Sequence, residues 1–356
     1  MKGDAPMELH DILLCRLHAQ HLLAPVNSLT AARDLCGFQA QFLRNAVHAL
    51  RLRTDELNTD GLIKSWTLRG TVHLFPRSDL PLYFRRCGTA DDVCESGWYQ
   101  WVSGRGHATS TPERERYFAN LAVEAIAQGN DTREGLRALL RDKGMTEGEE
   151  SHVFNGWGGL ISELAGMGVI GFRVEMKDGV YADETKRYCL LPKFEPMAEE
   201  AARLELARRY FTHFGPATLR DAAYFLHWTQ KEVREQLAKL PVQTIFCDGC
   251  TYYAIENGEP VRDMPPVILL AGFDQLMLGY RKEDNPFLPT EHLRGIFNLA
   301  GIVHPAILLY GRGVGRWKEK DGKVELTAFE TIKVKDKKLI EREVKRLFTV
   351  KKLIWV

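Results

Sequence analysis

The chain opens with apolar side chains at helical spacing, which predicts short helices. The first extends from Glu8 to Leu23 and stops before Pro25, whose ring removes a backbone donor that a helix needs. A second helix, capped by Ser28 or Thr30, reaches about Cys36, since a side-chain oxygen at either position can accept from a free backbone N–H.

A third helix is predicted after Gly37, a residue that commonly ends helices, and it extends to about Leu52. Its inward-facing residues are expected to be Phe42, Ala46, Ala49 and Leu50. The β-branched and aromatic stretch from Trp66 to Phe75 then predicts a strand. Three short helices followed by strands are typical of a winged helix-turn-helix.

The same order recurs in the middle of the chain. Helices are predicted over Thr132–Arg141 and Val153–Met167. Two strands over Val169–Tyr181 follow, joined by a turn at Lys177-Asp178-Gly179. This segment therefore predicts a second winged helix.

A third unit follows the helix predicted over Ala198–Phe214. Thr218 and Asp221 stand at capping-box spacing and begin another helix. The helix at Lys231–Leu240 has the position of a recognition helix, and strand-like Val242–Ile255 comes next. Along the recognition helix, Val233 and Leu237 face inward, while Lys231, Arg234 and Lys239 face outward.

From about Pro260 the pattern becomes proline-bounded and β-rich, as in Val267–Leu270 and Ala306–Tyr310. The predicted fold class is therefore α+β, with tandem winged helix-turn-helix units and a β-rich C-terminal region. The predicted regions are 1–105, 106–190 and 191–258 for the three winged helices, and 259–356 for the β-rich end with its basic tail.

Composition narrows the class of protein. With 356 residues, 45% of them hydrophobic, the chain is long enough for two to four domains. No apolar run approaches the ~18 residues of a membrane span, and the N-terminus lacks the apolar core of a signal peptide. Seven cysteines, an odd number, argue against a disulfide scaffold. We expect a cytoplasmic protein that does not bind membranes.

The formal charge of +1 hides a basic tail. The stretch from Lys333 to Val356 contains nine basic and three acidic residues, so its formal charge is +6 and the rest of the chain carries about −5. A basic tail with interleaved apolar residues suits nucleic acid. An edge strand or a helix with a solvated face is the alternative, and charge alone favours that alternative over nucleic-acid binding.

Three patterns resemble ligand sites but are better explained otherwise. Gly166-Met167-Gly168-Val169-Ile170-Gly171 closes a predicted helix and opens a strand, the reverse of a dinucleotide-binding turn. Cys247-Asp248-Gly249-Cys250 lacks a second ligand pair, so a hairpin turn is favoured. His18 and His21 have no carboxylate partner in the sequence nearby, and a half-buried helix face explains them. We expect no metal and no cofactor.

Two glutamines one residue apart, Gln39 and Gln41, are the main candidates for catalysis. Residues i and i+2 of an ideal helix point ~200° apart, so the amides can converge only at a helix entry, with residue 39 non-helical and residue 41 in the first turn. The alternative is two polar positions on an amphipathic helix. A glutamine cannot take a proton from water near neutral pH. A site built on this pair would therefore work by orientation and electrostatics.

Further on, Arg69, Thr71 and His73 alternate with apolar residues along the predicted strand. A strand face of these three types suits contact with phosphates or bases. The exposed side of an antiparallel strand is an equal alternative.

Several motifs in this order resemble a known family, the winged-helix DNA glycosylases of the AlkZ and YcaQ type. The resemblance extends from about Leu9 to Leu353. The motifs are Gln39-Ala40-Gln41; Trp66-Thr67-Leu68-Arg69-Gly70-Thr71-Val72-His73-Leu74; Pro216-Ala217-Thr218; Gly272-Phe273-Asp274 with Leu278-Gly279-Tyr280; and Gly311-Arg312-Gly313-Val314-Gly315-Arg316-Trp317.

The resemblance implies a concave, positively lined surface for duplex DNA and excision of N7-alkylated purines, with interstrand crosslinks unhooked by some members. It places the catalytic motif on Gln39 and Gln41, in the double-amide form of the AlkZ-like branch. The expected partner is double-stranded DNA containing alkylated purines, bound by a monomer. Expected DNA contacts are Thr67, Arg69, Thr71, His73, Lys231, Arg234, Arg312 and Arg316. A non-catalytic winged-helix regulator of transcription is the alternative function.

Overall fold

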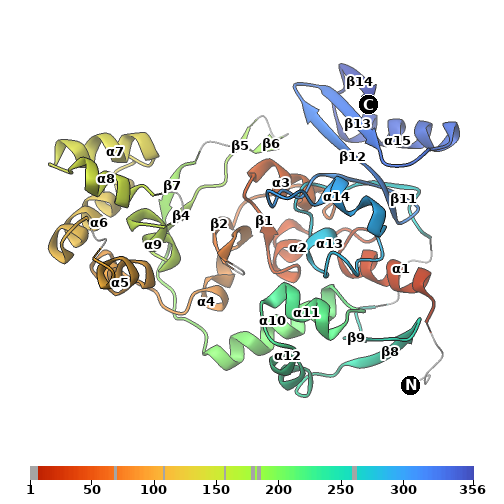
Figure 1. Cartoon of the computed structure of the whole chain (residues 1–356), viewed down its shortest axis with the longest axis horizontal. Coiled ribbons are helices and arrows are strands. Elements are labelled where there is room, and N and C mark those ends of the chain that lie inside the picture. Colours follow the sequence, from red (N-terminus) through yellow and green to blue (C-terminus); the bar gives the residue numbers. More distant parts are fainter. Residues whose placement is uncertain are drawn as a thin grey trace. The chain divides into compact units, whose positions relative to one another are not determined.

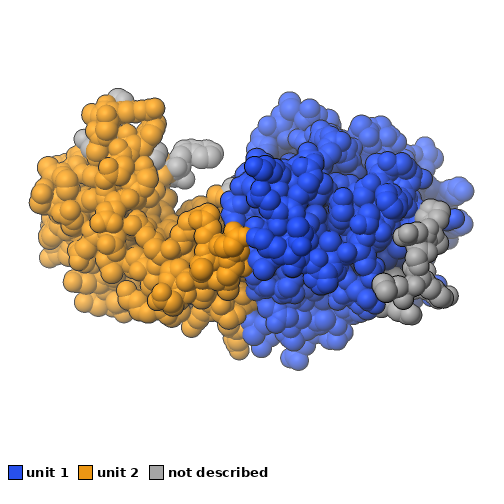
Figure 2. Space-filling model, turned by 90° about the horizontal axis from the view of Figure 1, so that it is seen from below, with its two compact units in different colours: residues 1–59, 203–356 blue, residues 60–202 orange. Residues whose placement is uncertain are grey.

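The computed structural model describes residues 7–67, 70–106, 109–155, 158–177, 181–182, 186–258 and 263–356. These residues form two compact units, drawn in different colours in Figure 2: Met1–Thr59 with Arg203–Val356 (unit 1), and Asp60–Ala202 (unit 2). Both mix helices with mostly antiparallel strands, which confirms the expected combination of α and β structure (Figure 1). Within the described ranges no helix combines the length and the apolar composition needed to cross a membrane.

Unit 1 begins with three short helices, as predicted, but their boundaries differ. The elements are α1 (Leu9–Ala19), α2 (Ser28–Asp34), β1 (Phe38–Gln39) and α3 (Leu43–Arg51). Asn27 caps α2 by accepting from the Thr30 N–H. The third helix starts at Leu43, because an extended segment intervenes after Gly37, whose φ of 82° turns the chain. Phe42 precedes that helix and is 37% exposed, so its inward assignment was wrong, whereas Ala46, Ala49 and Leu50 are buried.

A second group of elements in unit 1 follows the predicted order of helices and strands. It comprises α10 (Glu199–His213), which begins at the end of unit 2, α11 (Leu219–Leu226), α12 (Gln230–Leu237), β8 (Gln243–Cys247) and β9 (Cys250–Ala254). Thr218 with Asp221, and Thr229 with Glu232, form capping boxes at the starts of α11 and α12. Val233 and Leu237 are buried, while Lys231, Arg234 and Lys239 are exposed, which confirms the faces predicted for this helix.

The C-terminal part of unit 1 is a sheet in the order β10-β11-β12-β13-β14, antiparallel except for the parallel pair β13–β14. Its strands are β10 (Val267–Leu269), β11 (Ala306–Leu309), β12 (Arg312–Lys320), β13 (Lys323–Ala328) and β14 (Lys352–Trp355), and the helical segments are α13 (Gln275–Leu278), η4 (Thr290–His292), α14 (Leu293–Ile296) and α15 (Val334–Leu347). Ile340 and Val344 of α15 are buried against this sheet. The basic tail is thus a helix with a solvated face followed by an edge strand.

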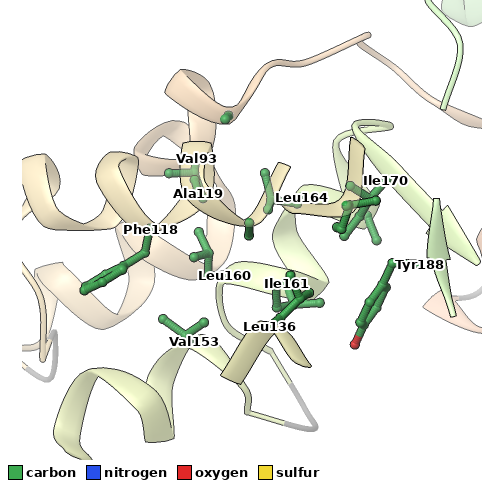
Figure 3. Packing of buried hydrophobic residues seen from close by; sticks show 14 of the residues in the cluster. Val93, Phe118, Ala119, Leu136, Val153, Leu160, Ile161, Leu164, Ile170 and Tyr188 are labelled. Atoms are coloured by element: carbon green, nitrogen blue, oxygen red, sulfur yellow. The ribbon is translucent and has the colours of Figure 1, made fainter. Parts of the chain in front are cut away.

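Unit 2 is largely helical. Its helical segments are η2 (Arg77–Asp79), α4 (Leu80–Tyr83), η3 (Ala90–Glu95), α5 (Gly97–Gly104), α6 (Pro112–Ala127), α7 (Arg133–Asp142), α8 (Glu147–Val153) and α9 (Leu160–Gly166). Its strands are β2 (Leu62–Trp66), β3 (Val72–Pro76), β4 (Ile170–Phe172) and β7 (Tyr188–Leu190), in the order β3-β2-β4-β7, with β5 (Met176–Lys177) paired to β6 (Tyr181–Ala182). Figure 3 shows the core, in which Phe118 of α6 and Leu136 of α7 lie among side chains of α8 and α9.

Two predictions for unit 2 were wrong in detail. The helix expected over Val153–Met167 begins only at Leu160, as α9, since α8 ends at Val153 and Gly159, with φ 99°, stands immediately before α9. The single strand expected over Trp66–Phe75 is a hairpin of β2 and β3, in which Trp66 pairs with Val72. In both cases a glycine with positive φ interrupts a continuous apolar pattern, Gly70 at 63° in the hairpin. The predicted turn residues Asp178 and Gly179 lie outside the described residues.

Two of the patterns that resemble ligand sites are turns, as expected. Gly166 ends α9, Gly168 has φ 73°, and β4 follows at Ile170, so this glycine run does not open a helix. Cys247 and Cys250 are opposite each other in the strand register at the turn of the β8–β9 hairpin, and both are free cysteines.

Candidate active site and nucleic-acid contacts

The two candidate glutamines lie in the extended segment between α2 and α3. Gln39 ends β1 and is 7% exposed, whereas Gln41 lies at a bend two residues before α3 and is exposed. The prediction that residue 39 is non-helical is confirmed. The prediction that residue 41 lies in the first helical turn was wrong, because α3 begins only at Leu43. One amide is therefore held within the fold of unit 1 and the other is open to solvent.

The turn that leads into this segment is held by Gln275. Cys36 and Gly37 both have positive φ, 55° and 82°, so the chain leaves the helical path there. The buried Gln275 amide donates to the carbonyl oxygen of Gly37, and lies 3.4 Å from that of Leu35. A side chain far along the sequence thus satisfies backbone acceptors that the end of α2 leaves free.

A buried ion pair supports the same segment. Arg53 and Asp274 are both fully buried and form a two-pronged contact, with Nη2 2.7 Å from Oδ1 and Nη1 3.0 Å from Oδ2. The guanidinium lies over the ring of Phe38, 5.5 Å from its centroid, and its Nε donates to the Gln20 carbonyl at 3.0 Å. Phe38, the residue before Gln39, is therefore packed against a charge whose position is fixed on several sides.

The segment that carries Asp274 also has tight steric requirements. A side chain at Gly272 would place its Cβ 2.7 Å from Nδ2 of Asn45 and 3.0 Å from the Val303 carbonyl oxygen, so a larger residue would force both neighbours to shift. Phe273 has φ 58°, and its ring lies 6.0 Å from that of Phe42. The Gly272-Phe273-Asp274 motif was noted in the sequence without a role. Its role is to support the glutamine segment, a role that sequence reasoning missed together with Arg53 and Gln275.

The predicted contacts at Thr67, Thr71 and His73 belong to the β2–β3 hairpin of unit 2. They do not alternate along one strand, because the Thr67 N–H donates to the Thr71 carbonyl oxygen at 3.1 Å and closes a turn. Thr67 Oγ1 lies 2.9 Å from His73 Nδ1, and His73 is 1% exposed. This nitrogen is therefore engaged within the hairpin. Arg69 lies outside the described residues.

The four other predicted contacts are cations of unit 1 in two different settings. Lys231 and Arg234 lie on the exposed face of α12, and Lys231 lies 3.9 Å from Glu235, at the outer limit of an ion pair. Arg312 in β12 is held between Glu291 at 3.2 Å and Glu330 at 3.0 Å, while Arg316 is half-buried opposite Thr327 of β13. Phosphate contact is therefore easier to reconcile with the α12 pair than with Arg312.

Comparisons with known proteins agree with one another. The chain matches the protein family described as DNA glycosylase AlkZ-like over residues 32–350. It is 25% identical over 334 residues to an interstrand DNA cross-link repair glycosylase of Streptomyces sahachiroi, a match covering 87% of this chain and 86% of that protein. The solved structure of the Streptomyces sahachiroi DNA glycosylase AlkZ has a TM-score of 0.70 and 21% identity, over 99% of this chain and 100% of that one.

Proposed function

Because this chain belongs to the AlkZ-like family of DNA glycosylases, enzymes that hydrolyse N-glycosyl bonds, we propose that it removes N7-alkylated purines from duplex DNA using Gln39 and Gln41. The proposal rests on how the segment that carries the two glutamines is held in place by residues distant in the sequence. One amide is buried and the other exposed, on a turn held by Gln275 and the Arg53–Asp274 pair. Such support suits a site that must orient groups accurately.

The leaving group explains why amides suffice. A guanine alkylated at N7 carries a positive charge, so breaking the bond to the sugar releases a neutral base without prior protonation. Water then adds to C1′ of the oxocarbenium-like sugar and loses its proton to solvent. A missing general base forgoes about 10²–10⁴-fold in rate, which is tolerable only with a good leaving group.

The two glutamines take different roles in this proposal. Gln41, which is exposed, orients the attacking water, while the buried Gln39 hydrogen-bonds the reacting nucleotide. Each amide can donate and accept, so it can hold a water by its oxygen and a nucleotide by its nitrogen. Neither step needs the glutamine to change its charge.

DNA binding is proposed to use tandem winged helices that line a concave surface, within regions 1–105, 106–190 and 191–258. The order α10, α11, α12 and the β8–β9 hairpin supports this assignment for the third region. Lys231 and Arg234 on α12 would contact phosphates. The other proposed contacts are Thr67, Arg69, Thr71, His73, Arg312 and Arg316. The enzyme is proposed to act as a monomer.

Crosslinked DNA is a further proposed substrate. The Streptomyces sahachiroi relative is named for repair of interstrand crosslinks, and it shares most of its length with this chain. Because bulky lesions make full base flipping difficult, excision with little extrusion of the nucleotide is expected.

A comparison of charged and neutral bases tests the proposal. Purified protein is incubated with duplexes that contain either N7-methylguanine or neutral hypoxanthine at one position, and free base and abasic sites are measured. Release of N7-methylguanine with hypoxanthine retained is the expected result. Equal release of both would contradict a mechanism without protonation. If neither base is released and tight sequence-specific binding is seen, the alternative of a winged-helix regulator is favoured.

A further inference from the structure

Unit 1 contains a group of metal-ligand side chains that the proposed reaction does not use. His21 Nε2 lies 3.0 Å from Asp34 Oδ2, and His213 Nε2 lies 3.6 Å from the same oxygen. The three ligand atoms lie within 4.8 Å of one another, and all three residues are buried. The side chains keep about a tenth of their surface exposed, which leaves solvent a route to the group. Sequence reasoning set His21 aside because its carboxylate partner is 13 residues away.

Two of the three side chains are held by contacts to the atoms that would not bind the metal, as metal ligands usually are. Arg33 Nη2 lies 3.0 Å from the other carboxylate oxygen of Asp34, Oδ1, and thereby leaves Oδ2 facing the histidines. His213 Nδ1 lies 3.3 Å from the carbonyl oxygen of Ala19. An outer partner that fixes a carboxylate or holds the second ring nitrogen is the usual support of a metal ligand.

The hydrogen bonding of His213 places electron-rich atoms opposite each other. A backbone carbonyl only accepts, so Nδ1 of a neutral His213 carries the proton and Nε2 presents a lone pair to Asp34. The Asn257 amide, 3.4 Å from Nδ1, can present its oxygen as readily as its nitrogen, so the fixed carbonyl decides. A cation between Nε2 and Oδ2 would satisfy both.

We propose that His21, Asp34 and His213 bind one divalent transition-metal ion, with Zn²⁺ the best fit. Two imidazole nitrogens and a carboxylate oxygen are a donor set that zinc accepts. In a tetrahedral site with bonds of about 2.0 Å the ligand atoms stand about 3.3 Å apart. The distances of 3.0 and 3.6 Å to Asp34 Oδ2 bracket that value. A water completes the fourth position.

The ion would act on the structure of unit 1 and would not enter the chemistry. His21 follows α1, Asp34 is the last residue of α2, and His213 is the last residue of α10. Asp34 comes directly before the left-handed turn at Cys36 and Gly37 that leads to Gln39. Bound zinc therefore joins three helix ends at the root of the glutamine segment. Two arginines that precede His213 on α10, Arg208 and Arg209, are each paired with Glu205 at 2.7 Å.

Zinc binding by the full chain tests the site without reference to catalysis. Protein stripped of metal with a chelator is titrated with Zn²⁺ in competition with a chromophoric chelator. Wild type is expected to bind one equivalent, and His21→Ala and His213→Ala to bind at least about tenfold more weakly. His10→Ala, which removes an exposed histidine of α1, is the matched control and keeps full affinity. Zn²⁺ should also raise the melting temperature of wild type more than that of His213→Ala.

X-ray absorption at the zinc edge covers the case in which a variant does not fold. Wild type loaded with one equivalent should show two imidazole ligands and light-atom ligands at about 2.0 Å. No stoichiometric binding by wild type would overturn the proposal. It would also be overturned by undiminished affinity in a folded His213→Ala variant, or by a zinc spectrum without imidazole scattering. In those cases the cluster is an ordinary hydrogen-bonded ion pair.

Discussion

The catalysis proposed for Gln39 and Gln41 would depend on supporting residues that no local sequence pattern connects to them. The glutamines were identified from the sequence because they form a short motif. Arg53 was missed, and Asp274 was noted without a role, because 221 residues separate the pair and a charged residue in a sequence gives no sign of burial. Phe42 was wrongly assigned to the inner face of a helix for a related reason. The helical pattern was continued through a segment whose backbone is extended in the structure. At the residue scale, the sequence singled out the glutamine motif, whose catalytic role stays a prediction, but not the residues that support it.

The Arg53–Asp274 pair gives the first prediction. Asp274→Asn leaves the Arg53 charge buried with only neutral acceptors, which costs about 3–5 kcal/mol. Urea unfolding measures the loss. Arg346→Ala, which breaks an exposed pair with Glu343, is the control and should cost less than about 1 kcal/mol. Equal effects of the two substitutions would show that Arg53 is not held as described.

His48 predicts a dependence of stability on pH. Burial lowers its pKa from 6.5 to about 4, against the opposing effect of its contact with the Leu269 carbonyl oxygen at 2.9 Å. Its pKa is lower in the folded than in the unfolded chain, so the unfolded chain takes up the proton first. Stability is therefore complete above about pH 6.5 and declines as the pH falls toward 4, by up to about 1.4 kcal/mol per pH unit.

Urea unfolding of wild type and His48→Gln at pH 7, 6 and 5 checks this. The glutamine keeps a donor for Leu269 but does not titrate, so the variant should lose less stability on acidification. A residual slope is expected from His213, whose pKa burial also lowers to about 4. Identical slopes in the two proteins would rule out His48 as a source of the pH dependence.

At the scale of elements, predictions succeeded where the signal is local. The capping box at Thr218 and Asp221 marked the start of α11 correctly, because its residues are three apart and bond each other's backbone. The wrong elements, such as the helix expected over Val153–Met167, cross a glycine with positive φ. Whether a glycine adopts such a φ depends on tertiary packing, which a hydrophobic pattern does not record.

The N-cap of α12 gives a prediction at this scale. The Thr229 hydroxyl oxygen accepts from the Glu232 N–H at 3.2 Å, and the hydroxyl donates to the Glu232 carboxylate at 2.8 Å. Thr229→Ala should cost about 1 kcal/mol of stability, while Thr229→Ser should cost only a few tenths. Thermal or urea unfolding distinguishes the two variants. A loss of the same size in both would mean that the threonine methyl group, and not the cap, stabilises the helix.

For the whole molecule, the sequence predicted the mixture of helices and strands and the glycosylase family. It did not predict the two-unit division, in which the N-terminal residues join the C-terminal half of the chain. Strand and helix patterns describe neighbours along the chain, whereas this division follows contacts between residues far apart in the sequence, such as Arg16 with the Pro216 carbonyl oxygen, 200 positions away. The four predicted regions stay a prediction.

DNA binding by the whole molecule should depend on which cations are free to meet phosphates. Arg234→Gln should weaken binding to all DNA sequences alike. It should also reduce the slope of log Kd against log salt concentration by about 1. Arg312→Gln should change the slope less, because Glu291 and Glu330 already neutralise that guanidinium. Fluorescence anisotropy with a labelled duplex at several salt concentrations measures both. Equal reductions would place Arg312 among the phosphate contacts.

In the proposed mechanism an exposed amide, without a general base, assists the loss of a charged purine. The most direct measurement is single-turnover release of N7-methylguanine from duplex DNA by wild type, Gln41→Ala and Gln128→Ala, the last an exposed glutamine at the end of α6. We expect Gln41→Ala to be slower by about 10²-fold or more, with DNA affinity and unfolding unchanged, and Gln128→Ala to match wild type. Release by Gln41→Ala at the wild-type rate would contradict a role for Gln41 in the reaction.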